Sequence, residues 1–139
     1  MAIVRACGTP DLFVTITCNP RWAEILAALL NGQTAQDRPD LVSRVFNLKL
    51  KAVMHDLTEL NIFGKAVANI HVIEFQKKGL PHAHILIVLD KLNKPHTPDD
   101  VDSMICAEIP NKDKYPDLYD TVVSCMLHGP CGTSNPTAS

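Results

Sequence analysis

The sequence predicts an α+β fold in which helices flank a central antiparallel sheet. Short runs rich in β-branched residues alternate with longer segments whose apolar residues recur at helical spacing. Two of the strand-like runs are separated only by a turn that contains glycine and proline, residues 77–81. This arrangement predicts an antiparallel hairpin at the centre of the sheet.

The first predicted strand covers residues 11–18, where β-branched and aromatic side chains alternate. Because successive side chains of a strand point to opposite faces, Phe13, Thr15 and Thr17 are expected to share one face. The Asn19-Pro20 pair that follows is typical of a helix start, since asparagine caps helices and proline fits the first helical position. We therefore expect a helix to begin at this pair.

A longer amphipathic helix is predicted over residues 40–60, where apolar residues keep a helical period. It is expected to end at the glycine-containing break of residues 61–64. Beyond this break the patterns predict two strands and two further helices, over residues 66–76, 82–89, 97–108 and 117–127.

Length and composition indicate one domain. With 139 residues, of which 46 % are hydrophobic, the chain can bury a core. We expect residues 1–132 to form the domain and the small, polar residues 133–139 to form a mobile tail. The longest wholly apolar run, residues 85–89, is far too short to cross a membrane, and no apolar signal segment is present. The sequence thus predicts an intracellular protein with no membrane partner.

The cysteine and charge patterns further limit the classes of protein to which the chain can belong. The five cysteines are odd in number and form no Cys-x-x-Cys pair, which predicts reduced thiols. A net charge of −2 argues against a strongly basic nucleic-acid binder. Residues 44–78, however, carry six basic and three acidic groups. They form either a surface for phosphates or an ordinary solvated helix face.

The predicted hairpin carries the residues with the clearest chemistry. His82 and His84 open its second strand and share a face, and Glu74 and Gln76 share a face of the first strand. If the strands pair, two imidazoles and one or two oxygen donors meet, which is a donor set for a divalent cation. A His-x-His pair alone is weak support, since such pairs on a sheet are more often hydrogen-bonded structural features.

Three blocks of sequence, in this order, carry a family resemblance. They read Phe-Val-Thr-Ile-Thr-Cys-Asn-Pro at 13–20, Glu-Phe-Gln-Lys-Lys-Gly-Leu-Pro-His-Ala-His at 74–84 and Met-Leu-His-Gly-Pro-Cys-Gly at 126–132. Together they resemble the helicase-like N-terminal domain of Helitron transposon proteins, over almost the whole chain. Three ordered blocks are far more specific than His-x-His by itself.

The resemblance implies a rolling-circle replication initiator of the HUH endonuclease type, with an HUH/Rep-like fold. His82 and His84 match the two histidines of that class, and Ala83 stands where a bulkier apolar residue is common. The implied cofactor is a divalent metal, Mg²⁺ or Mn²⁺, with Gln76 or Glu74 as the third ligand. The implied substrate is single-stranded DNA, which a tyrosine hydroxyl nicks and transfers.

The resemblance also implies DNA contacts beside the metal. The hydroxyls of Thr15 and Thr17 and the amide of Asn19 are expected to position phosphates. Lys77 and Lys78, in the hairpin turn, are expected to meet phosphates as well. Each has an ordinary alternative: the threonines as strand formers, Asn19 as a helix cap, and the lysines as a solvated turn.

The chain departs from the family at the nucleophile. The family's tyrosines lie on a helix further along than residue 139, and Tyr115 and Tyr119 do not match their motif. There is no Gly-x-x-x-x-Gly-Lys-Ser/Thr ATPase motif. We therefore expect the metal- and DNA-holding part of a longer, nuclear transposase polypeptide, inactive alone. Whether the chain is itself an enzyme stays open. A non-catalytic DNA- or protein-binding relic and a small two-histidine metallohydrolase are the alternatives.

Overall fold

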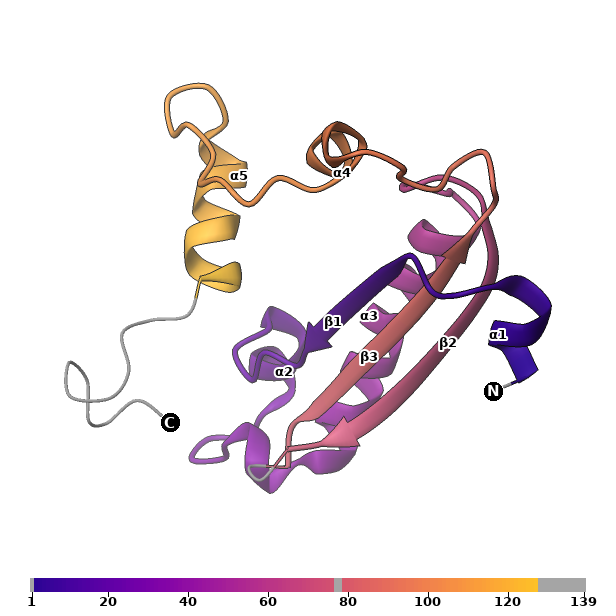
Figure 1. Cartoon of the computed structure of the whole chain (residues 1–139). Coiled ribbons are helices and arrows are strands. Elements are labelled where there is room, and N and C mark those ends of the chain that lie inside the picture. Colours follow the sequence, from indigo (N-terminus) through magenta and orange to yellow (C-terminus); the bar gives the residue numbers. More distant parts are fainter. Residues whose placement is uncertain (1, 77–78, 128–139) are drawn as a thin grey trace, which may run out of the picture. The chain divides into compact units, whose positions relative to one another are not determined.

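The computed structural model describes residues 2–76 and 79–127 of the chain. It divides into two compact units, Met1–Asp100 and Val101–Ser139. The predicted mobile tail lies outside the described residues. The elements of the first unit, in chain order, are α1 (Ala2–Cys7), β1 (Leu12–Thr17), α2 (Ala23–Ala28), the 3₁₀ turn η1 (Ala35–Asp37), α3 (Pro39–Thr58), β2 (Ala66–Phe75) and β3 (Pro81–Leu89) (Figure 1).

The regular elements described in the second unit are helical, with loop and turn between them at residues 105–115. Helix α4 (Pro98–Met104) crosses the boundary between the units, and α5 (Pro116–Thr121) continues into a π-helical turn, η2 (Val122–Met126). Asp100 N–H donates to Thr97 Oγ1 at 3.2 Å, and Thr97 N–H donates to the Asp100 carboxylate at 2.8 Å. Backbone N–H groups of His96 and Thr97 lower the pKa of Asp100. No helix in the described part of the chain is long and apolar enough to cross a membrane.

The sheet has three antiparallel strands in the order β1-β3-β2, which confirms the predicted α+β class. Strand β3 takes the centre because its side chains are nearly all apolar and can be buried. Strand β1 pairs with it from Leu12 opposite Ile87 to Thr17 opposite His82. Strand β2 pairs along its other side as the predicted hairpin. The sequence therefore predicted both the strands and their central pairing.

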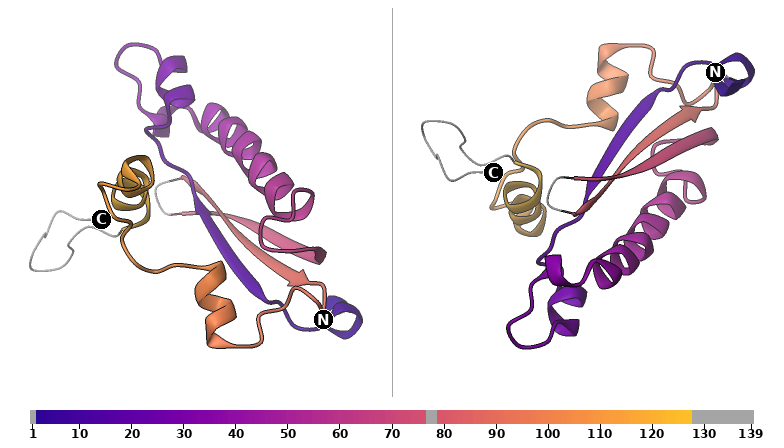
Figure 2. Two further views of the ribbon diagram at one scale, coloured as in Figure 1. Left: turned by 90° about the horizontal axis from the view of Figure 1, so that it is seen from above. Right: turned by 90° about the horizontal axis from the view of Figure 1, so that it is seen from below.

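Helix α3 lies along one face of the sheet, as both views of Figure 2 show. Every second side chain of β3 is buried on this face, namely Pro81, Ala83, Ile85, Ile87 and Leu89. The helix contributes a stripe at helical spacing, namely Val42, Val45, Phe46, Leu50 and Leu57. These two sets form most of the core of the first unit, and α3 leaves the opposite face of the sheet open.

The helix expected at Asn19-Pro20 starts later than predicted. Asn19 Oδ1 accepts a hydrogen bond from Arg21 N–H at 2.9 Å, so its side chain closes a local turn and does not cap α2. Trp22 is extended, with ψ 138°, and α2 follows at Ala23. The Trp22 ring stacks on Phe46 of α3 with centroids 6.4 Å apart. This contact holds Trp22 against α3 in an extended conformation, outside the helix.

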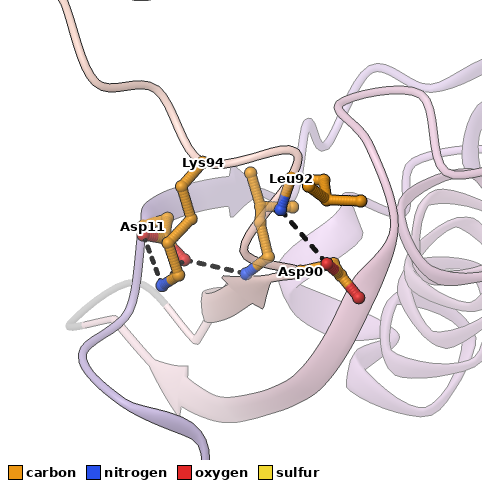
Figure 3. A network of polar contacts seen from close by, with 5 residues as sticks. Asp11, Asp90, Leu92 and Lys94 are labelled. Carbon is orange, nitrogen blue, oxygen red and sulfur yellow. Dashed lines mark hydrogen bonds and ion pairs between the residues drawn. The ribbon is translucent and has the colours of Figure 1, made fainter.

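A network of polar contacts joins the start of β1, the end of β3 and the loop after β3, at the end of the sheet far from the histidines (Figure 3). The Asp11 carboxylate accepts from Leu89 N–H at 2.8 Å and from Lys94 Nζ at 2.7 and 2.9 Å. Asp90 accepts from Leu92 N–H at 3.1 Å in the same loop. The network ties the start of β1 to the end of β3, and so it fixes the register between these strands.

The cysteines of the described residues are all free thiols, as the odd count predicted: Cys7, Cys18, Cys106 and Cys125. Cys18 is 2 % exposed, and this burial raises the pKa of its thiol. A buried, protonated thiol is unreactive, so Cys18 is a packing residue.

Candidate functional site

The open face of the sheet carries the predicted histidines. His82 and His84 alternate with buried Ala83, so their side chains leave β3 on the face that α3 does not cover. Both are half-buried. Strand β1 places Thr17 opposite His82 and Thr15 opposite His84. Residues far apart in the sequence are thereby brought to one small area, which we call the histidine face.

The two imidazoles lie side by side. Their ring centroids are 4.5 Å apart and the rings meet edge to face, with an interplanar angle of 70°. His84 Nε2 lies 3.8 Å from Glu74 Oε2, whose side chain is 64 % exposed. Two imidazoles and a carboxylate thus lie on the histidine face, and metal binding by them stays a prediction.

The threonines of β1 reach the other ring nitrogens. Thr17 Oγ1 lies 2.7 Å from His82 Nδ1, a distance typical of a firm hydrogen bond. Thr15 Oγ1 lies 3.5 Å from His84 Nδ1, at the outer limit of such a bond. Both Nδ1 atoms therefore face β1, and His84 Nε2 faces Glu74 on β2.

The two candidates for the third ligand lie at different points of the hairpin. Glu74 lies directly opposite His82 in the ladder between β2 and β3. Gln76 lies just beyond the last residue of β2, and its N–H donates to Leu80 O at 3.0 Å in the hairpin turn. Glu74 is thus the oxygen donor that the structure brings to the histidines, whereas Gln76 belongs to the turn.

An aromatic ring of β1, which the sequence reading assigned no role at the site, completes the histidine face. Phe13 of β1 stacks on His84 with centroids 5.4 Å apart and an interplanar angle of 6°. Its side chain is 64 % exposed, and Val72 of β2, opposite His84, is 52 % exposed. The signal was present in the sequence, because Phe13 shares the strand face of Thr15 and Thr17.

Asn19, the lysines of the hairpin turn and the two tyrosines complete the list of residues considered from the sequence. Asn19 follows the end of β1, and its side-chain oxygen is engaged with Arg21 N–H. Lys77 and Lys78 lie outside the described residues, so their DNA contacts stay a prediction. Tyr115 and Tyr119 belong to the second unit, where Lys112 Nζ lies 5.5 Å from the Tyr119 ring centroid.

The donor types of the histidine face fit Mn²⁺, and Mg²⁺ when water fills other positions. Within residues 2–76 and 79–127, no three His, Cys, Asp or Glu side chains already stand close enough together to hold an ion. His84 Nε2 and Glu74 Oε2 lie 3.8 Å apart. Both side chains are partly exposed and have room to turn.

Comparison with known proteins supports the resemblance seen in the sequence. No curated protein matches the chain. A family model described as the Helitron helicase-like domain at the N-terminus matches residues 1–87. The matched part is more than half of the chain, and it includes β1, all but the last two residues of the hairpin and the whole histidine face. The chain therefore belongs to the Helitron helicase-like N-terminal domain family, whose members are Helitron transposon proteins.

Proposed function

We propose that the histidine face binds a divalent metal and single-stranded DNA, as the metal- and DNA-holding part of an HUH-type nicking and strand-transfer enzyme. The observation that carries this proposal is the meeting of His82, His84 and Glu74 on one open sheet face. Membership of the Helitron family supports the DNA substrate. An antiparallel sheet with flanking helices is also the architecture expected of this class.

The chemistry assigned to such a site is phosphoryl transfer. A metal ion held there supplies positive charge that stabilises the negative charge developing on the phosphate. A tyrosine hydroxyl attacks the phosphorus, the bond to the 3′ oxygen breaks, and a 5′-phosphotyrosine and a free 3′-hydroxyl result. We propose that this tyrosine comes from another part of a longer polypeptide. The residues described here hold the phosphate, exposing a bound strand to attack.

Removing both histidines is expected to abolish metal binding. In an isothermal titration with Mn²⁺, the native chain should bind, and the His82→Ala, His84→Ala double variant should show no measurable heat. The control is His71→Ala, because His71 of β2 lies opposite Ile85 and so on the other face of the sheet. Equal Mn²⁺ affinity in the native chain and the double variant would reject the site.

The third ligand is expected to be Glu74. In the same titration, Glu74→Ala should weaken Mn²⁺ binding by about 10–100-fold, a typical effect of losing one supporting group at a metal site. Gln76→Ala should have a smaller effect, since Gln76 lies in the turn beyond β2. The reverse order of the two affinities would assign the role to Gln76.

A DNA-binding assay distinguishes the proposed function from that of a relic that binds DNA without metal. Fluorescence anisotropy with a labelled single-stranded oligonucleotide should show binding that falls when a chelator removes the metal. A relic that holds DNA only through basic side chains keeps its affinity in chelator and loses it as salt rises. Chelator-insensitive binding would therefore favour the relic.

A further inference from the structure

We infer that Thr17 is a positioning residue that sets the tautomer of His82. Its hydroxyl oxygen accepts a hydrogen bond from His82 Nδ1–H and so leaves the Nε2 lone pair free for a metal ion. This inference rests on the proposed function, because it names what prepares one ligand of that site. It gives β1 a role in the metal chemistry beyond contact with DNA.

The distances single out Thr17. Its oxygen lies 2.7 Å from His82 Nδ1, whereas the matching pair of Thr15 and His84 is 3.5 Å apart. Thr17 and His82 are directly opposite in the ladder of β1 and β3, so the backbone holds the two side chains together. One histidine of the pair is thus firmly oriented by a hydroxyl, and the other only loosely.

The tautomer matters because a neutral imidazole has two ring nitrogens but only one N–H proton, which sits on one of them. Free histidine prefers that proton on Nε2, where it would block a metal. An acceptor at Nδ1 reverses the preference, as the outer partners of metal-bound histidines generally do. Thr17 is placed to be this acceptor, since its oxygen faces Nδ1.

The same geometry leaves Thr17 free to do a second task. When its oxygen accepts from His82, the hydroxyl proton is not used in that bond and can be donated to a phosphate oxygen. A single side chain then connects the imidazole that holds the metal to the DNA strand. The threonine contacts with DNA that the sequence predicts are therefore compatible with the positioning role.

The test is isotope-edited NMR of the metal-free chain, labelled with ¹⁵N at histidine, at a pH where free histidine is neutral. The ¹⁵N shifts of a ring show which nitrogen is protonated, and the His82 signals are identified by their loss in His82→Gln. The expected result is Nδ1–H in the native chain and a shift toward Nε2–H in Thr17→Val. Thr17→Ser keeps the hydroxyl and should restore the native tautomer.

Mn²⁺ titration supplies the second readout. Thr17→Val should weaken binding by about 10–100-fold, Thr17→Ser by much less, and Thr15→Val by less than Thr17→Val. Circular dichroism and thermal unfolding show whether each variant keeps the fold. A native His82 with its proton on Nε2, or equal Mn²⁺ affinity in folded Thr17→Val, overturns the inference. Absence of Mn²⁺ binding by the native chain would instead overturn the proposed function, and the NMR result would still decide the hydrogen bond.

Discussion

Replacing Phe46 by alanine is expected to lower the free energy of unfolding by about 3–5 kcal/mol, the usual cost of truncating a buried aromatic side chain. Phe46 is 2 % exposed, belongs to the core stripe of α3 and stacks on the ring of Trp22. The variant loses buried apolar surface and leaves a cavity that its neighbours fill only partly. Small domains are stable by only about 5–15 kcal/mol, so a large share of the total would disappear.

Urea unfolding followed by circular dichroism measures this loss. The matched control is Leu48→Ala on the same helix, since Leu48 is 67 % exposed and its truncation removes little buried surface. We expect the Leu48 variant to stay within about 0.5 kcal/mol of the native chain. Similar losses in the two variants would show that α3 does not pack on the sheet through Phe46.

Replacing Gly64 by alanine is expected to cost about 2–4 kcal/mol, because backbone strain and a steric clash add together. Gly64 has φ +103°, a left-handed conformation that side chains disfavour. An added Cβ would also lie 2.6 Å from Asn93 Cβ. Asn93 cannot move away freely, since its Oδ1 accepts from Lys65 N–H at 3.1 Å and helps to start β2.

Gly32→Ala separates the two causes. Gly32 has a similar φ of +84°, but no atom lies within 4 Å of the position of an added Cβ. In this control the free energy of unfolding should therefore fall only by the cost of backbone strain, about 1–2 kcal/mol. Thermal or urea unfolding of both variants gives the comparison, and equal losses would exclude the clash with Asn93.

Much of the fold was predictable because strong local patterns agreed with the final packing. The alternation in β1, the helical stripe of α3 and the Gly-Pro turn each favour one structure, and the sheet satisfies all three. The start of α2 was not predictable from Asn19-Pro20. There a tertiary contact, the stacking of Trp22 on Phe46, prevails over a local capping signal.

The candidate site was predictable in its residue types and less so in its partners. The alternation rule alone places His82 with His84 and Thr15 with Thr17. Which strand lies beside which, and in which register, depends on pairing over long distances in the sequence. The position of Glu74 beside the histidines and the contact between Thr17 and His82 therefore required coordinates.

The contacts that make up the histidine face are expected to form one after another during folding. Glu74, His82 and His84 lie on one hairpin, and hairpins close within about 1–10 μs. Thr17 meets His82 only after β1 has crossed a separation of 65 residues, a slower and entropically more costly closure. If these residues bind a metal as proposed, a newly made chain would bring the proposed ligands together before Thr17 aligns His82, and an ion bound early would meet an imidazole that is still free to rotate.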